Sequence, residues 1–324
     1  MKDGVLHRAF AGLLIAASIA FGAQAQQYPV KPLRMIVPFP PGGPGDVVAR
    51  PLAEGMQAVL GQPVVVDFRP GAGAIVGVRS LLSAPSDGYT MFMGSNVISL
   101  SMALYRKLPY DTLRDLRGVA SVAISPYLLL VPSGFPAATV NDLIRMAKAE
   151  PDKLNFASSG PGTMAHVAAL LFNDAAGIRM THVPYKGAGP AIPALIAGEV
   201  QVFLDNVFSS QSFVKGGRLK ALGVTSRARV EQFPDLPTLD EQGLKDFEVL
   251  AWFGVVTHKA VPDAIVALLN EAVNRAMQTP SVRDRYASIG VTPVGGTSQS
   301  FQKFIEHDIE AMVRVVRSAG ISLD

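Results

Sequence analysis

Two glycine-rich stretches of this chain have the composition of anion-binding loops. The first, residues 38–46 (PFPPGGPGD), joins an apolar run to a helical pattern. Glycines such as Gly42 and Gly43 let backbone N–H groups approach a ligand, and a helix start favours a carboxylate or phosphate by about 0.3–1 kcal/mol. Asp46 is expected to cap that helix. The alternative is a tight strand-to-helix connection that binds no ligand.

The second stretch, residues 157–163 (ASSGPGT), places serine and threonine hydroxyls beside glycines at another predicted helix start. It has the same physical character as the first. His166 follows Thr163 by three residues, so it lies one turn inside the helix, where it would support the loop by hydrogen bonding. Two such loops in separate halves of the chain favour a shared binding role over chance.

A second class of function uses Ser158 or Ser159 as the nucleophile of an exported serine hydrolase, with His166 as its base. The chain lacks a G-x-S-x-G sequence, and no acidic residue is placed to orient the imidazole, so this hypothesis ranks below binding. The remaining histidines after residue 25 are isolated and suggest no metal site: His182, His258 and His307.

Three further turns end predicted strands. Residues 69–77 (RPGAGAIVG) differ from G-x-G-x-x-G in their last gap and lack an acidic ribose partner, so no dinucleotide cofactor is expected. Tyr185, Lys186 and Gly187 place a ring and a cation before a helix, although Lys186 alone is equally consistent with a solvated charge. Asp205 ends an apolar strand, where ligands of open α/β sheets bind, or it caps the next helix.

These loops require a framework of alternating strands and helices, which predicts an α/β fold of doubly wound sheets. Strands are expected at 33–39, 63–68, 90–94, 127–131, 155–158, 180–185, 200–205, 219–225, 249–256 and 291–294. Helices are expected at 46–60, 74–83, 139–150, near 163, 190 and 209, and at 262–278, 281–288 and 298–318. The region from 96 to 119 is predicted as helix plus loop. A capping box is expected at Thr139 and Asp142.

The whole-chain composition narrows the class of protein. The chain has 324 residues, 49% of them hydrophobic and 17% charged, which is enough apolar material for two domains. The net charge of +3 comes without a block of basic residues, so neither a nucleic-acid nor a membrane-surface footprint is expected. Without cysteine, the protein has neither disulfides nor thiol chemistry.

The first 25 residues predict a cleavable signal peptide. Lys2 and Arg8 form a basic segment, residues 9–21 are apolar, and residues 23–25 (AQA) match a cleavage site. The apolar run is shorter than the roughly 20 residues that span a bilayer. We therefore expect export to the periplasm of a chain that is not embedded in the membrane.

Five motifs, in chain order over essentially the whole exported part, resemble the Bug-type periplasmic receptors. These are the solute-binding proteins of tripartite tricarboxylate transporters. The motifs are P-F-P-P-G-G-x-x-D-x-x-A-R (38–50), R-P-G-A-G (69–73), S-S-G-x-G-T-x-x-H (158–166), P-Y-K-G-x-x-P-A (184–191) and P-T-L-x-E-x-G (237–243). The resemblance implies a type II periplasmic-binding-protein fold, with two α/β lobes (26–124 plus 252–324, and 125–251) joined by a two-strand hinge.

The resemblance also implies what the loops bind. A carboxylate ligand, either a di- or tricarboxylate or an aromatic acid, would be held by backbone and hydroxyl groups, without catalysis, cofactor or metal. The implied contacts are Phe39, Gly42, Gly43 and Asp46 on one wall and Ser158, Ser159, Gly162, Thr163 and His166 on the other, with Lys186, Gly187 and Asp205 assisting from the second lobe. Selectivity is expected to depend on side chains such as Phe39, Asn96 and Tyr185. The implied partners of this monomer are membrane permease subunits. A receptor that feeds a signalling partner instead stays an alternative.

The chain departs from the family pattern at three places. Gly45 replaces a hydroxyl or small residue near the first loop, Phe68 replaces a common asparagine, and residues 257–262 (THKAVP) replace Pro-Ala-Gly-Thr-Pro. The first departure bears on ligand contacts, and the other two bear on scaffold or hinge.

Overall fold

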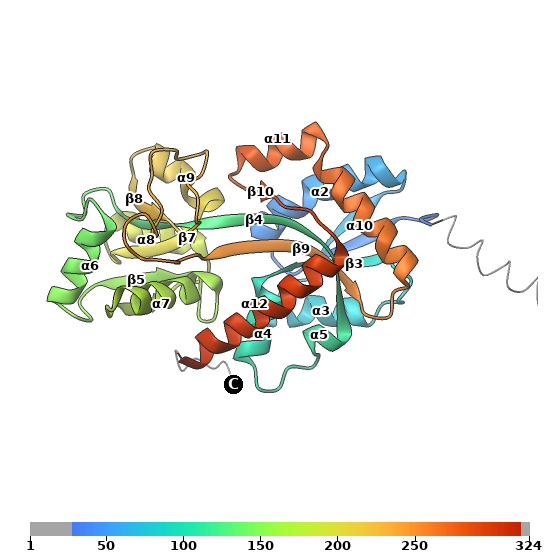
Figure 1. Ribbon diagram of the computed structural model, residues 1–324, viewed down its shortest axis with the longest axis horizontal. Helices are drawn as coiled ribbons and strands as arrows, with labels where there is room; N and C mark the ends of the chain where they lie inside the picture. The colour runs from blue at the N-terminus through green and yellow to red at the C-terminus, as the bar shows by residue number, and fades with distance from the viewer. Residues whose placement is uncertain (1–27, 319–324) are drawn as a thin grey trace, which may run out of the picture.

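Two long antiparallel strands run through the molecule and carry a lobe at each end (Figure 1). The computed structural model describes residues 28–318, so the predicted signal peptide (1–25) lies outside the described residues. Strands β4 (Leu116–Pro132) and β9 (Leu250–His258) pair with each other along the first lobe and the middle of the molecule. The remainder of β4 enters the second lobe, so one sheet extends through both lobes.

The first lobe is built on β1–β3, whose strand order is β2-β1-β3-β9-β4 and in which β1 lies parallel to both β2 and β3. Its elements are β1 (Leu33–Val37), α2 (Pro44–Leu60), β2 (Val64–Phe68), η2 (Ala72–Ala74), α3 (Ile75–Leu82), β3 (Thr90–Ser95), α4 (Asn96–Leu104), α5 (Thr112–Asp115), α10 (Asp263–Met277), α11 (Pro280–Ser288), β10 (Thr292–Pro293) and α12 (Ser298–Ser318).

The second lobe continues the sheet in the order β4-β7-β5-β6, with β8 paired to β4. Its elements are α6 (Val140–Ala149), β5 (Asn155–Ser158), α7 (Met164–Ala176), β6 (Thr181–Pro184), α8 (Ala188–Ala197), β7 (Val202–Asn206), α9 (Val207–Lys215) and β8 (Leu219–Val224). Strand β5 lies parallel to both β6 and β7. The prediction of two α/β lobes with doubly wound sheets is confirmed.

Strand β4 is much longer than the strand expected at 127–131. Residues 116–126 belong to it as well, although this part was predicted to be irregular up to residue 119. Gly118 and Pro126 interrupt the β-type pattern, and the pairing with β9 shifts twice between Gly118 and Ala123. Such bulges add a residue to one strand, so neither alternation nor a continuous apolar run marks the strand in the sequence.

Helix starts follow the local sequence more closely. Thr139 and Asp142 form the predicted capping box of α6, and the Thr163 hydroxyl caps α7. The prediction for α2 was wrong, because Gly43 is its N-cap and Asp46 lies inside the first turn. Pro44 begins that helix; proline suits the first helical position because its N–H would be unpaired there in any case.

A small apolar cluster joins the two lobes on one side of the sheet. It combines Leu100 and Leu104 of α4 and Met312 and Val316 of α12 with Val167 of α7, which is fully buried. Figure 1 shows α12 crossing below β4 and β9 toward α7 of the second lobe. Helix α7 also begins at the second glycine-rich loop. The contact between the lobes therefore bears on the position of that loop.

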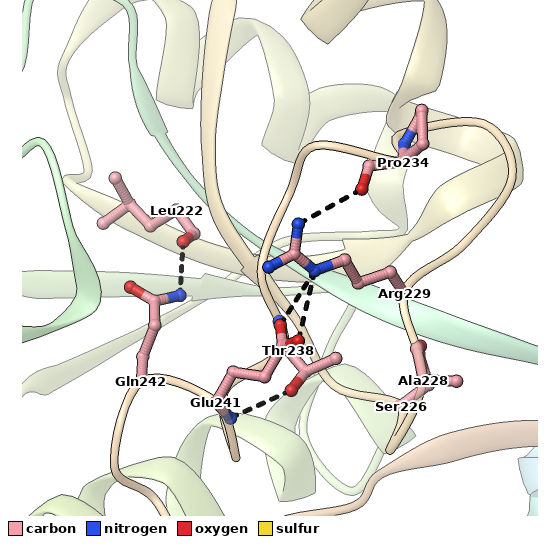
Figure 2. A network of polar contacts seen from close by, with 8 residues as sticks. All are labelled: Leu222, Ser226, Ala228, Arg229, Pro234, Thr238, Glu241 and Gln242. Carbon is pink, nitrogen blue, oxygen red and sulfur yellow. Dashed lines mark hydrogen bonds and ion pairs between the residues drawn. The ribbon is translucent and has the colours of Figure 1, made fainter.

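The motif at 237–243 lies in the long connection between β8 and β9 and stabilises the fold of this connection (Figure 2). Thr238 and Glu241 bond reciprocally, each side chain accepting from the other residue's backbone N–H, and Arg229 donates to the Glu241 carboxylate. Gln242 donates to the Leu222 carbonyl of β8 at 2.8 Å and accepts from the Val140 N–H at the start of α6. This network attaches the connection between β8 and β9 to the second lobe.

Replacing Gln242 by alanine is expected to destabilise the protein by about 1–2 kcal/mol, because a part-buried carbonyl and an N–H both lose their partner. Urea unfolding measures this change. Lys245→Ala on the same connection is the control and should leave the midpoint unchanged, because its side chain is exposed. Equal midpoints for the two variants would show that the connection is not held by Gln242.

Candidate functional site

The carboxyl ends of the parallel strands in both lobes point to the same border between the lobes. Strand β3 ends at Ser95 opposite Phe253, which pairs with Ala123 of β4. Strand β7 ends at Asn206 opposite Tyr127 of β4. Ala123 and Tyr127 are four residues apart, so the two strand ends are separated by about 13 Å along β4, at roughly 3.3 Å per residue. That spacing suits a small molecule.

The loops singled out from the sequence lie at this border. If the pairing of β1 with β3 is extended past the strand ends, Phe39 lies opposite Ser95 in the first lobe. The same extension of the β5 pairings puts Ser159 opposite Tyr185 and Asp205 in the second lobe. Helices α2, α4, α7, α8 and α9 directly follow strands β1, β3, β5, β6 and β7 and begin at this border. Their positive ends favour an anion between the lobes.

The first loop already contains a carboxylate of its own. Asp46 is only 6% exposed, accepts from the Gly42 N–H at 2.7 Å, and lies 2.5 Å from the Arg50 Nε. The Gly43 N–H donates to the Pro40 carbonyl. Gly45 is required sterically, because a Cβ there would come within 2.5 Å of the Phe39 ring. The loop is therefore a rigid turn whose shape is fixed by Asp46 and by the contact between Gly45 and Phe39.

The second loop is fixed by hydroxyls and imidazoles. The Thr163 hydroxyl donates to the Gly160 carbonyl at 2.8 Å and accepts from the His166 N–H. Gly162 donates its N–H to Nδ1 of His166, so the predicted support of the loop by this histidine is confirmed. Ser158 is fully buried, whereas Ser159 is part-exposed, which leaves Ser159 the better placed of the two serines for a ligand.

A histidine that the sequence analysis set aside also belongs to this loop. The His182 Nε2 lies 2.6 Å from the Ser158 hydroxyl, and its ring stacks on that of His166 with centroids 3.9 Å apart. His182 occupies β6, which is adjacent to β5 in the sheet. Since this neighbourhood arises from strand pairing, no spacing along the sequence marks it.

The loop after β6 is tied to the second glycine-rich loop by its backbone. Tyr185 and Gly187 donate their N–H groups to the carbonyls of Ser158 and Ser159. Gly187 is the N-cap of α8 at φ 103°, a conformation that favours glycine. Lys186 is exposed, so it provides a solvent-facing cation at the border rather than a buried counter-ion.

Asp205 is buried at the end of β7. It is 2% exposed, and its carboxyl group accepts from the Ser209 hydroxyl at 2.6 Å. Burial raises the pKa of Asp205 to about 7, and the hydrogen bond from Ser209 opposes that rise. The helix cap considered for Asp205 is not formed, because Asn206 is the N-cap and α9 begins at Val207.

Asn96 connects the first lobe to the long strand β9. Its side-chain oxygen accepts from the Trp252 N–H at 2.9 Å, and its amide donates to the Leu250 carbonyl at 3.3 Å. Asn96 is 5% exposed and directly follows β3. Its side-chain hydrogen bonds therefore stabilise the middle of the molecule.

The polar groups at the border are hydroxyls, helix starts and paired arginines. Within residues 28–318, no cluster of histidine and acidic residues could hold a metal ion. Arg69 of the 69–73 motif bonds Asp67, and Arg50 contacts Asp46. An open groove between α10 and α12, lined by Arg117 and Lys303 among others, lies away from the strand ends. We place the candidate site at the strand ends because the part-exposed Ser159 and the helix starts of both lobes converge there.

The geometry does not support Ser158 as a nucleophile. Its hydroxyl contacts His182 rather than His166, and its residue has no exposed surface for a substrate. None of the hydrogen bonds in the described part of the chain joins a carboxylate to His182. The arrangement lacks the third member that orients the base in serine hydrolases.

This two-lobed fold is that of the type II periplasmic binding proteins. The family model "Tripartite tricarboxylate transporter family receptor" matches residues 48–321, and the chain belongs to this family of receptors. No helix in residues 28–318 is both long enough and apolar enough to cross a membrane.

Curated relatives and solved structures agree with the family model. The chain is 37% identical over 315 residues to Protein BugT of Bordetella pertussis, which covers 96% of this chain and 97% of that protein. It is similar to the structure of R. palustris Rpa4515 with adipate (TM-score 0.82, 32% identity, 91% and 99% coverage). It is also similar to MatC from Rhodopseudomonas palustris with bound malate (TM-score 0.78, 32% identity, 89% and 100% coverage).

Proposed function

We propose that this protein is a periplasmic receptor that captures a small carboxylate between its lobes and delivers it to a membrane permease. The observation that carries the proposal is the convergence of strand ends and helix starts from both lobes on one border. Membership of the receptor family supports it, as do the adipate and malate that two similar structures contain. The signal peptide at 1–25 and a monomeric state remain part of the proposal.

Ligand capture would proceed by closure of the lobes about β4 and β9. The proposed lobes, 26–124 plus 252–324 and 125–251, meet where Ser125 pairs with Ala251. Closure excludes water, which strengthens each hydrogen bond to the anion because the local dielectric falls. The closed surface would then be the one that a permease recognises.

The proposed contacts come from both lobes and use little formal charge. Phe39, Gly42 and Gly43 would line the first wall with the start of α2. The second wall would be formed by Ser159, Gly162, Thr163, Tyr185, Lys186 and Gly187. Five of the expected contact residues are buried: Asp46, Asn96, Ser158, His166 and Asp205. We propose that they contribute to binding mainly by hydrogen bonds that hold the neighbouring loops and strands in place.

We propose a linear C4–C6 dicarboxylate as the ligand, because the two similar structures named above hold malate and adipate. The strand ends are about 13 Å apart along β4, and helix starts on both sides offer one anion site each. Phe39 and Tyr185 would pack against the carbon chain, although an aromatic acid could stack on the same rings.

Isothermal titration calorimetry with a panel of carboxylates tests the proposal. Malate, adipate, citrate, benzoate and acetate would be compared at one ionic strength. We expect at least one dicarboxylate to bind with a Kd near or below 10 μM, that is about −7 kcal/mol, and acetate to bind at least a hundredfold more weakly. Binding no tighter than millimolar by every member of the panel would contradict carboxylate capture.

Ser159→Ala is expected to weaken dicarboxylate binding about tenfold, because the loss of one hydrogen bond to an anion costs about 1.5 kcal/mol. Thr163→Ala should weaken binding similarly and also destabilise α7 by about 1 kcal/mol through loss of its cap. Calorimetry and thermal unfolding separate the two effects. Ser212→Ala on the exposed face of α9 is the control. Unchanged affinity in both variants would move the site away from this loop.

A further inference from the structure

Two imidazoles stack beside the second glycine-rich loop, which the proposed function places at the ligand. The rings of His166 and His182 are 10° from parallel, and the Phe156 ring packs beside both, with its centroid 4.9 Å from that of His182 and 6.2 Å from that of His166. Each ring is connected to a glycine N–H of the loop, one of them directly and the other through a serine. These connections fix which nitrogen of each ring carries a proton.

The proton of His182 follows from the hydrogen bonds of Ser158. The Ser158 hydroxyl oxygen accepts from the Gly160 N–H at 3.1 Å and lies 2.6 Å from Nε2 of His182. Because Ser158 is fully buried, its own hydroxyl proton needs an acceptor, and Nε2 is the one within reach. Nε2 is therefore unprotonated, and neutral His182 carries its proton on Nδ1.

The proton of His166 follows from the N–H of Gly162. That N–H donates to Nδ1 of His166 at 3.2 Å, so Nδ1 is unprotonated and the proton is on Nε2. The two stacked rings are consequently both neutral and carry opposite tautomers. Each ring uses its unprotonated nitrogen to hold one connection to the loop.

We propose that His166 and His182 are positioning residues that together fix the binding loop 158–163, with His182 acting on Gly160 through Ser158 and His166 acting on Gly162 directly. This inference deepens the proposed function, since the loop is one wall of the proposed site. The Gly160 and Gly162 N–H groups are used in these connections, so the two histidines act by fixing the shape of the loop. A loop that is already in its binding shape loses less entropy when an anion binds. Neither histidine needs to touch the ligand for this role.

The surroundings of the pair keep it neutral. Burial lowers the pKa of His166 to about 4, with the neighbouring His182 as a smaller cause, and burial also lowers the pKa of His182 below its usual value. The titratable groups on the adjoining elements are Tyr185 and Lys186 after β6 and Asp205 at the end of β7. None of the contacts in the described part of the chain joins these groups to either imidazole.

The first experiment uses ligand-free, ¹⁵N-labelled protein. Long-range ¹H–¹⁵N spectra of the imidazoles at pH 7.5 should show the Nδ1–H tautomer for His182 and the Nε2–H tautomer for His166. Ser158→Ala should shift His182 toward the Nε2–H tautomer and leave His166 unchanged. Finding His182 as Nε2–H in the wild-type protein, or either ring protonated, would overturn the proposal even if the protein binds carboxylates.

The second experiment separates positioning from simple stability. His182→Phe keeps a ring for stacking but removes the acceptor, and Ser158→Ala removes the relay; His307→Phe, at an exposed position of α12, is the control. Each of the first two should speed hydrogen exchange at Gly160 at least tenfold and weaken malate or adipate binding about tenfold. The double variant should bind no more weakly than the weaker-binding of the two single variants, because His182 acts on the loop only through Ser158.

The outcomes distinguish this inference from the proposed function. Exchange at Gly160 that is unchanged in both single variants, or an additive hundredfold loss of affinity in the double variant, would overturn the relay. If the wild-type protein binds no carboxylate, the proposed function fails, while the tautomers and the Gly160 exchange still decide the relay.

Discussion

Substituting Val167 by aspartate is expected to separate the two lobes. Val167 is fully buried between Leu100 and Leu104 of α4 and Met312 and Val316 of α12, which belong to the other lobe. An ionised carboxylate has no partner in this apolar cluster, and leaving a buried charge unpaired costs about 3–5 kcal/mol. Opening the lobes hydrates the charge, so the open form becomes the more populated one.

The consequence for binding follows from the population of the closed form. If closure becomes unfavourable by about 3 kcal/mol, the apparent affinity for a dicarboxylate falls by roughly a hundredfold. Small-angle X-ray scattering of the ligand-free protein should show a larger radius of gyration. Ala175→Asp, an exposed position on the same helix, is the matched control and should change neither quantity. An unchanged radius and affinity for Val167→Asp would show that this cluster does not hold the lobes together.

Asp205→Asn is expected to stabilise the protein above neutral pH and to have little effect in acid. The pKa of Asp205 is about 7 in the folded chain against 3.8 for the ordinary group, so the folded chain holds a proton that the unfolded chain releases between these values. Wild-type stability therefore falls as the pH rises from about 4 to about 7. At 1.36 kcal/mol per pKa unit, the loss reaches about 4 kcal/mol at most.

Asparagine keeps an acceptor for the Ser209 hydroxyl but cannot ionise, so the variant lacks this part of the pH dependence. Urea unfolding of the ligand-free proteins at pH 4.5, 6 and 8 measures the difference between variant and wild type, in which other titrating groups cancel. Asp284→Asn, exposed on α11, is the control. A difference between Asp205→Asn and wild type that stays constant with pH would contradict the raised pKa.

Features encoded within a few residues were predictable from the sequence. The predicted capping box of Thr139 and Asp142 depends on residues only three positions apart. A helix start was predicted near residue 163, and the structure adds that the Thr163 hydroxyl caps it by accepting from the N–H three residues later. The alternation of apolar runs and helical patterns likewise gave the α/β class, because each pattern is local. The candidate loops were located by the same means.

Features created by pairing of distant strands were not predictable. The contact between His182 and Ser158 spans 24 residues and requires β6 to lie beside β5 in one register. The full length of β4 depends on β9, more than 100 residues later in the chain. Asp46 was assigned to the helix cap from its residue type, whereas the proline at position 44 starts the helix earlier. The His182–Ser158 contact and the length of β4 therefore depend on residues far away in the sequence. The start of α2 depends on competition between two local signals.

The most direct test of the central claim is a crystal structure of the protein with the tightest-binding dicarboxylate of the calorimetric panel. We predict electron density for the ligand at the border between the lobes, with one carboxylate at the 158–163 loop and the other at the 38–46 loop. Density at the groove between α10 and α12 or elsewhere on one lobe, with the strand ends occupied only by water, would contradict the account.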